Sequence, residues 1–154
     1  MNKLLTATLL LAFVMVACEK SEVENNDGIQ ITIGSVCGWC VGSDSIVITS
    51  DNMIYTTYSP CDTNIEETRY KTNANDWKEL TNLLDYEEFE KIDINTCYVC
   101  ADGCDTWITV KNGESSHSIR FGYPDSLTIQ PIIPFINKLD SLRTVLSPRK
   151  EEDQ

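Results

Sequence analysis

The stretch DTWITVKNGESSHSIRF, residues 105–121, decides the fold because two strand-like segments flank a tight turn. Asn112 and Gly113 form the dipeptide most typical of a two-residue hairpin turn, in which both central positions need positive φ. A turn centred there fixes which residues face each other. The opposed pairs are Lys111 with Glu114, Val110 with Ser115, Ile108 with His117, Thr106 with Ile119, Asp105 with Arg120 and Cys104 with Phe121. Because two pairs join opposite charges and the apolar residues share one face, the stretch predicts an antiparallel hairpin.

Strand patterns also precede this hairpin. In residues 29–33, isoleucine alternates with polar residues, which is the period of a half-buried strand. Residues 45–49 and 53–58 have the same character and are separated by a short polar loop, so they predict a second hairpin. A further strand is expected at residues 67–72.

The register of the second hairpin depends on the length of its loop. A three-residue loop with Asn52 in the left-handed conformation sets Ile48 opposite Ile54, whereas a two-residue loop sets Ile48 opposite Tyr55. We favour the three-residue loop, because it gathers Ile46, Ile48 and Ile54 on one face.

Two helices complete the expected elements. Asn73 or Asn75 can cap the first helix, and its apolar residues recur at helical spacing. These residues are Trp77, Leu80 and Leu84. The second helix begins near Pro131 or Pro134, since proline is tolerated in a first turn. Its apolar stripe consists of Ile132, Phe135, Ile136, Leu139, Leu142 and Leu146. The order predicts an α+β fold with an antiparallel sheet of about five to six strands built from hairpins, and two helices packed on one face.

The amino-terminal segment predicts export. Residues 4–17 form an apolar run of 14 residues, too short for a membrane-spanning helix of about 20 residues, so residues 1–17 are interpreted as a signal peptide. The segment VMVAC, residues 14–18, resembles the bacterial lipoprotein box, with a departure at Met15, where leucine is usual. The resemblance implies that Cys18 becomes the amino-terminal residue, carries lipid such as palmitate, and anchors the protein in the bacterial outer membrane, on its periplasmic or cell-surface face.

Charge and composition divide the rest of the chain. Residues 18–28 are expected to be the lipidated cysteine and an acidic tether, residues 29–147 one domain, and residues 148–154 a charged tail. The net charge is −12, and removing residues 1–17 removes Lys3 and no acid, which gives −13. Such a surface repels phosphate backbones, so nucleic acid is excluded as a partner. The acidic residues after Cys18 resemble an export signal for the outer face of the outer membrane.

Apart from Cys18, the chain has an even number of cysteines, which in an exported protein predicts a disulfide framework of up to three bridges with fifteen possible pairings. The candidates are Cys37, Cys40, Cys61, Cys97, Cys100 and Cys104. A bridge between the first cluster and the second closes a longer loop than one within a cluster, so it stabilises more. We therefore expect at least one bridge from the segment 97–104 to Cys37, Cys40 or Cys61.

Two alternatives use the same sulfurs. The tetrapeptide CGWC, residues 37–40, resembles a thioredoxin-type site, but the residues after it predict a turn and a strand rather than a helix, and no Lys or Arg lies between Lys20 and Arg69. The surrounding acids therefore raise the thiol pKa. CGWC and CYVC could together supply four sulfurs to zinc, although an oxidising compartment removes thiolates.

Little else in the sequence predicts chemistry. His117 is the one histidine and is not accompanied by a nucleophile motif, so no catalytic residue, metal or cofactor is assigned. Trp39 and Trp107 are candidate ligand-binding residues. The order of elements in residues 29–146, with the loop between Cys37 and Cys40, resembles a small domain of unknown function in bacterial lipoproteins. The sequence thus predicts a non-catalytic binding or structural module that meets an envelope protein or glycan through the loops 37–43 and 97–104.

Overall fold

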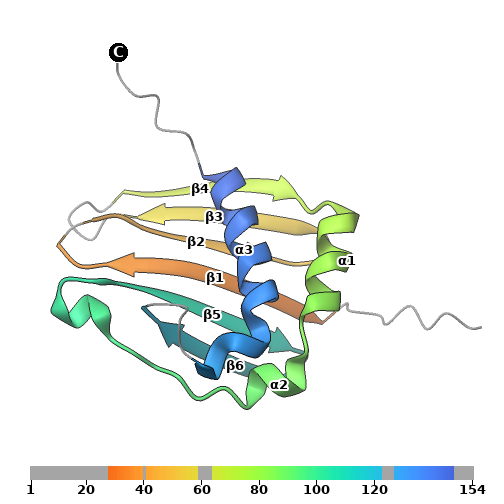
Figure 1. The fold of residues 1–154 in the computed structure, drawn as a ribbon. Coiled ribbons are helices and arrows are strands. Elements are labelled where there is room, and N and C mark those ends of the chain that lie inside the picture. The colour runs from red at the N-terminus through yellow and green to blue at the C-terminus, as the bar shows by residue number, and fades with distance from the viewer. Residues whose placement is uncertain (1–27, 40, 59–63, 123–126, 148–154) are drawn as a thin grey trace, which may run out of the picture.

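The computed structural model describes residues 28–39, 41–58, 64–122 and 127–147. These residues form one six-stranded sheet with helices on a single face (Figure 1). The strands are β1 (Ile29–Cys37), β2 (Ser43–Ile48), β3 (Asn52–Tyr58), β4 (Ile65–Lys71), β5 (Cys104–Asn112) and β6 (Ser115–Phe121). The helices are α1 (Ala74–Leu83), α2 (Tyr86–Glu90) and α3 (Ile133–Leu146), with 3₁₀ turns η1 (Tyr98–Ala101) and η2 (Leu127–Ile132).

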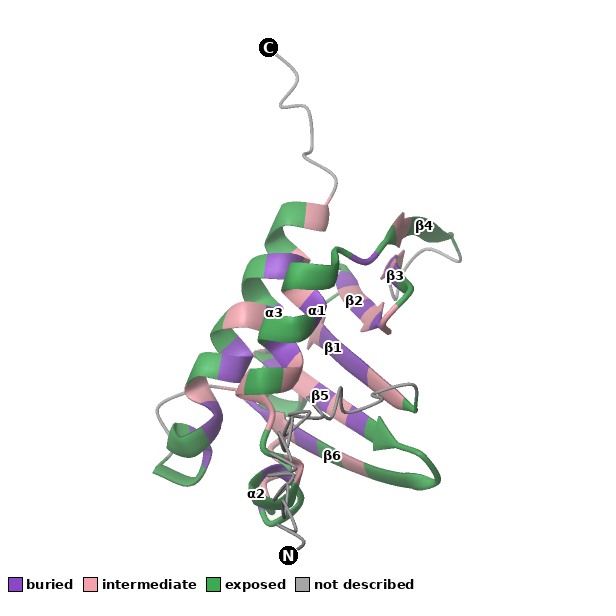
Figure 2. Ribbon diagram, turned by 90° about the vertical axis from the view of Figure 1, so that its right-hand side faces the viewer, coloured by how far each residue is buried: buried purple, intermediate pink, exposed green. Residues whose placement is uncertain are grey.

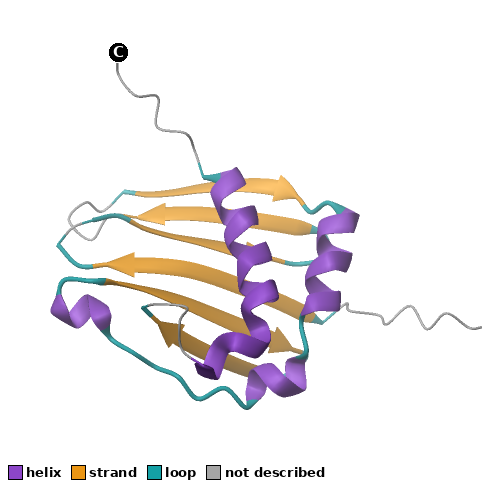
Figure 3. Ribbon diagram, viewed as in Figure 1, coloured by secondary structure: helices purple, strands orange, loops and turns teal. Residues whose placement is uncertain are grey.

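The sheet has the order β4-β3-β2-β1-β5-β6, and all neighbours are antiparallel. The two longer helices, α1 and α3, lie side by side over one face, and none of the described α-helices lies over the other face (Figures 2 and 3). The predicted α+β class, with an antiparallel sheet and two helices on one face, is therefore confirmed. Among the described residues, no helix is long and apolar enough to cross a membrane.

Local sequence accounts for the helix positions. The Asn73 side chain caps α1 by accepting a hydrogen bond from the N–H of Asn75 at 2.8 Å. The chain then leaves the helix at Leu84, and Asp85 caps the short helix α2 through the N–H of Glu88 at 3.1 Å. Pro134 stands in the first turn of α3, where its missing N–H costs little.

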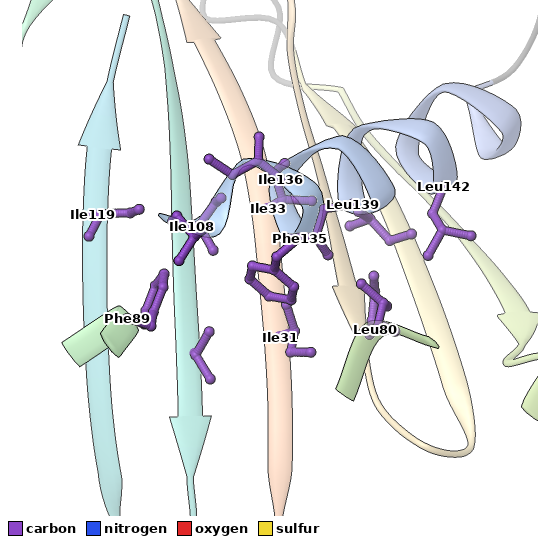
Figure 4. Close-up of a cluster of buried hydrophobic side chains, with 14 of the residues drawn as sticks. Ile31, Ile33, Leu80, Phe89, Ile108, Ile119, Phe135, Ile136, Leu139 and Leu142 are labelled. Carbon is purple, nitrogen blue, oxygen red and sulfur yellow. The ribbon is translucent and has the colours of Figure 1, made fainter. Parts of the chain in front are cut away.

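The core lies between the helices and the covered face of the sheet (Figure 4). Burying each such Leu, Ile or Phe side chain stabilises the fold by about 1.5–3 kcal/mol. The fully buried large residues are Ile31, Ile33, Ile46, Ile48, Leu80, Phe89, Ile108, Val110, Ile119, Ile129, Phe135 and Leu139.

Polar contacts tie the helical layer together and to the sheet. Lys138 of α3 contacts Asp76 at 2.8 Å and Glu79 at 2.6 Å, both on α1. Near the other end of α3, Arg143 contacts Asp44 of β2 at 3.2 Å. Asp44 also accepts hydrogen bonds from Ser35 Oγ at 2.6 Å and Tyr55 Oη at 3.1 Å.

The predicted register of the β5–β6 hairpin is wrong by two residues. The turn consists of Gly113 and Glu114, and Asn112 stays in the strand opposite Ser115. Gly113 has a φ of 59° and Glu114 does not take positive φ, which matches a type II′ turn with glycine first. A shift of two residues keeps every side chain on its face, and here it sets Ile108 opposite Ile119, joining two core residues.

The preferred register of the β2–β3 hairpin is also wrong, as is its alternative. The N–H of Thr49 donates to the carbonyl of Asn52 at 2.9 Å, and the Thr49 hydroxyl accepts the N–H of Asn52 at 3.1 Å. These bonds close a loop of two residues and set Ile48 opposite Met53. Ile54 therefore lies on the face without helices, and Met53 and Tyr55 join the core.

Candidate functional site

A disulfide joins Cys37, the last residue of β1, to Cys104, the first residue of β5. The two cysteines oppose each other in the β1–β5 ladder, with their Cα atoms 4.1 Å apart, and 67 positions separate them in the sequence. This bridge links the first cysteine cluster to the second and so confirms the expected long cross-link. It also means that Cys37 does not bond within the CGWC tetrapeptide.

A second disulfide joins Cys97 to Cys100 across η1. Both cysteines are exposed. The remaining framework candidates, Cys40 and Cys61, lie outside the described residues, as do Cys18, the predicted signal peptide and the charged tail.

The buried carboxylate of Asp105 holds η1 against the sheet. It accepts the backbone N–H groups of Tyr98 at 3.0 Å and Val99 at 3.1 Å, and it pairs with Arg120 Nη2 at 2.8 Å. The Thr96 hydroxyl donates to it at 3.2 Å. The Asp105 side chain is 0% exposed, so each of these partners offsets the loss of water.

The pKa of Asp105 reflects this environment. Burial by itself raises the carboxyl pKa, but the N–H groups of Val99 and Tyr98 and the Arg120 guanidinium lower it by more. The net pKa lies below the ordinary value of 3.8, and the group is ionised at neutral pH. The sequence predicted the Asp105–Arg120 pair from a register that was wrong. The pair forms diagonally instead, because Arg120 faces Trp107.

The loops at one end of the sheet carry an apolar rim, which we define as the exposed large side chains between β1 and β2, at the start of β4, at the end of β3 and in η1. These are Trp39, Val41, Tyr58, Ile65 and Tyr98. They are five of the seven exposed large hydrophobic residues among those described. These segments lie at the same end of the strands, at the left in Figure 1. Exposed apolar groups are therefore concentrated rather than scattered.

Trp39 is the most prominent residue of the rim. Its side chain is 79% exposed and its φ is 54°, a conformation that bulky residues rarely adopt. The N–H of the preceding Gly38 donates to the carbonyl of Gly103 at 3.1 Å, and the N–H of Val41 donates to the carbonyl of Gly38 at 3.2 Å. Together with the adjacent disulfide, these bonds fix the loop that presents the indole.

Trp107 lies elsewhere. It is on the sheet face without helices, and its indole rests on Gly34 of the neighbouring strand β1. A Cβ atom at Gly34 would come within 2.6 Å of the ring, so this position needs glycine. Trp107 is consequently half-buried, and the structure does not bring the two candidate tryptophans into one site.

His117 makes the contacts of a structural residue. Its Nε2 lies 2.8 Å from the carbonyl oxygen of Ile92, and its ring meets Phe89 edge-on at 5.4 Å. It faces Val110 rather than Ile108. In the part of the chain that the structure describes, no three His, Cys, Asp or Glu side chains are grouped so that they can hold a metal ion.

A recess of about 700 Å³ opens at the other end of the sheet, between the junction of α1 with α2 and the start of β1. Its described lining contains Asp85 and Glu87 and no basic side chain. The recess includes neither a cysteine nor a tryptophan among these residues, so it is separate from the rim.

No known protein family matches the sequence, and no curated protein matches it either.

Proposed function

We propose that this protein is a lipid-anchored module of the bacterial envelope that binds a protein or glycan partner through the apolar rim. The observation that carries the proposal is Trp39, an exposed tryptophan on a loop fixed by a disulfide and by backbone hydrogen bonds. Tryptophan is the residue type that most often dominates binding energy at interfaces.

The conformation of Trp39 supports this role. A non-glycine residue with left-handed φ costs about 1–3 kcal/mol and persists where the surroundings impose it. Because the loop is fixed before any partner arrives, less conformational entropy is lost on binding. An indole held out in water in this way gains most when a partner covers it.

The position of the rim relative to the predicted anchor also supports the proposal. The chain enters the domain at Gly28, before β1, whereas the rim lies beyond the far end of that strand. A strand of nine residues spans about 30 Å. A tether from Cys18 therefore joins the domain away from the surface that we assign to the partner.

The anchor is tested in the producing host. We expect the full chain to incorporate labelled palmitate, and the Cys18→Ser variant to lose the label and to leave the membrane fraction. Equal labelling of both chains would contradict lipidation at Cys18. The four cysteines of the described bridges, Cys37, Cys97, Cys100 and Cys104, serve as the internal control, because disulfide-bonded sulfurs do not accept lipid.

The rim is tested by capture from envelope extract with the full chain as bait. We expect Trp39→Ala to reduce recovery of the bound partner at least about tenfold, as for an interface residue of central importance. Trp107→Phe, which keeps an aromatic ring over Gly34, is the matched control and should recover the partner normally. Treating the extract with protease beforehand distinguishes a protein partner from a glycan. Recovery that is unaffected by Trp39→Ala would contradict the proposal.

The second candidate function is thiol–disulfide exchange, with zinc binding by the CxxC pairs as its variant. The exposure of Cys97 and Cys100 favours exchange, in which a thiolate of an incoming dithiol attacks one sulfur and the other leaves. The nearby negative charge is unfavourable for a thiolate at this bridge, because the Asp105 carboxylate accepts the N–H of Val99, which lies between the two cysteines.

The two functions differ in a thiol titration of the exported protein, with metal analysis alongside. A binding module should retain all its bridges under a mild reductant. Reduction of Cys97–Cys100 at the glutathione poise, or stoichiometric zinc, would favour the second candidate.

A further inference from the structure

The two outer strands of the sheet, β6 and β4, differ in whether another described segment pairs with their outer edge. Residues 94–96 run beside β6 and form a parallel bridge between Asn95 and Arg120. The N–H of Thr96 donates to the carbonyl of Arg120, and the N–H of Arg120 donates to the carbonyl of Ile94, both at 2.9 Å. At the opposite side, β4 is the last strand, and no other described segment pairs with its outer edge.

The residues of β4 are exposed along almost the whole strand. Six of its seven residues are exposed, and only Tyr70 is half-buried. An edge strand presents unpaired N–H and C=O groups that can accept another strand. Proteins that avoid such pairing use short edges, prolines, bulges or charged side chains. β4 is a full-length strand without proline, and its charged residues carry both signs, so they can pair with a second copy of the same strand.

We propose that β4 pairs with β4 of a second copy of this chain, antiparallel and centred on Thr68, so that two six-stranded sheets become one continuous sheet. The pairing is isologous, because the same strand contributes from both copies. It shares Ile65 with the apolar rim but not Trp39, and it does not depend on the proposed function.

Symmetry restricts the possible registers. A two-fold axis that brings two outer edges together in antiparallel fashion must be perpendicular to the sheet, so both helical layers lie on the same side. Side chains that face each other must then point to the same face of the sheet. The residue at the axis therefore faces its own copy rather than the copy of its sequence neighbour, because neighbours along a strand point to opposite faces. Glu67, Thr68 and Arg69 are the three positions near the middle of β4 that keep most of the strand paired.

Charge selects among these registers. An axis at Glu67 places two carboxylates opposite each other. An axis at Arg69 sets Glu67 opposite Lys71 but places two guanidinium groups opposite each other. An axis at Thr68 instead sets Glu67 of each copy opposite Arg69 of the other, with the two threonines facing each other at the centre. Opposite charges and threonine pairs are favourable neighbours across strands, and like charges are unfavourable.

The observed conformation suits this arrangement. Arg69 Nη2 already lies 2.6 Å from Glu67 Oε1 within the strand, on the sheet face without helices. Both side chains remain largely exposed, at 68% and 45%. In the paired state each carboxylate therefore has a guanidinium beside it and another across from it.

Cysteine cross-linking tests the register in the full chain. Facing residues of an antiparallel pair have Cα atoms about 4.5–5.5 Å apart, which is within disulfide range. Diagonal neighbours, such as Glu67 and its own copy when the axis is at Thr68, are about 8 Å apart, which is beyond that range. We expect Thr68→Cys to give at least about tenfold more covalent dimer, above the unsubstituted chain, than Glu67→Cys or Arg69→Cys. Equal yields, a maximum at 67 or 69, or a cross-link to a different protein would overturn the proposal.

A charge exchange tests the pairing without added cysteines. By sedimentation of the full chain in detergent, Glu67→Arg and Arg69→Glu should each raise the dimer dissociation constant about tenfold, because two favourable pairs become two repulsive ones. The double variant should return to within about threefold of the unsubstituted chain. Glu87→Arg on α2 is the control for net charge and should have no effect. A monomer at all concentrations, or a double variant that is not restored, would overturn the proposal.

Discussion

On one side of β1 lie β5 and β6, and on the other side lie β2, β3 and β4. The β5–β6 side has a disulfide to β1, a second disulfide within η1 and an ion pair with the buried carboxylate of Asp105, and its outer edge is covered by residues 94–96. The β2–β4 side, as far as the structure describes it, ends in an exposed strand whose ion pair is on the surface. The first side is suited to hold η1 and the segment that precedes Trp39 in place, and the second is suited to association.

Loss of the bridge between β1 and β5 should have the largest effect on stability. Replacing both Cys37 and Cys104 by serine should lower the free energy of unfolding by about 4 kcal/mol, because the disulfide joins residues 67 positions apart. Urea unfolding without reductant measures the loss. A decrease below about 1 kcal/mol would show that the β5–β6 side does not depend on this cross-link.

Replacing Asp105, whose carboxylate binds η1, should have the next largest effect on the free energy of unfolding. Asp105→Asn puts an amide donor where two N–H groups and Arg120 converge, so we expect a loss of about 3 kcal/mol. Asp102→Asn is the matched control, because it removes the same charge three residues away, at the end of η1, and asparagine tolerates the observed φ of 62°.

The stabilising contribution of Asp105 should also depend on pH. The pKa of Asp105 is lowered in the folded protein, so its stabilising contribution is complete above the ordinary value of 3.8 and is lost as the pH falls through the folded pKa. The stability difference between the unsubstituted chain and Asp105→Asn should be constant at neutral pH and should narrow below pH 3.8. A difference that already narrows at neutral pH would mean that the carboxylate is not held ionised by its partners.

The short bridge should contribute less than the long one. Replacing Cys97 and Cys100 by serine should cost about 2 kcal/mol, since the closed loop spans a sequence separation of only 3. Because Asp105 still binds the backbone of η1, we expect hydrogen exchange to increase at residues 97–101 and not in β1. A loss as large as that from the long bridge would contradict this ranking.

The smallest effect is expected at the open edge. Glu67→Gln should change the unfolding free energy of the monomer by less than about 0.5 kcal/mol, because the Glu67–Arg69 pair is exposed. Thermal unfolding at low protein concentration measures this change. A large effect would mean that β4 depends on its surface charges, and the contrast between the two sides would be lost.

The helices and strands could largely be predicted because their signals are local. The alternation of Ile29, Ile31 and Ile33 identifies β1, and Asn73 is the observed cap of α1. The strand registers could not be predicted in the same way, because a shift of two residues in β5–β6 leaves the same side chains on the same faces. Pairing with β1, which sets Ile31 opposite Val110 and Ile33 opposite Ile108, is available only in the assembled sheet.

The candidate site shows the same division. The sequence identified both tryptophans, yet their exposure differs because Trp107 has a glycine opposite it on the next strand and Trp39 stands on a loop. The sequence also expected a bridge between the two cysteine clusters, but fifteen pairings were open. Cys37 bonds to Cys104 because β1 and β5, distant in the chain, are neighbours in the sheet.

By itself, the sequence determined the composition, the net charge, the period of each strand and the apolar stripe of each helix, since these depend on residues near one another in the chain. Tertiary structure alone decided the strand registers, the partners of Asp105, the positions of Trp39 and Trp107, and which edge strand the described residues leave unpaired. Each of these depends on which distant segments become neighbours, and that is set by burial of the common core rather than by local preference.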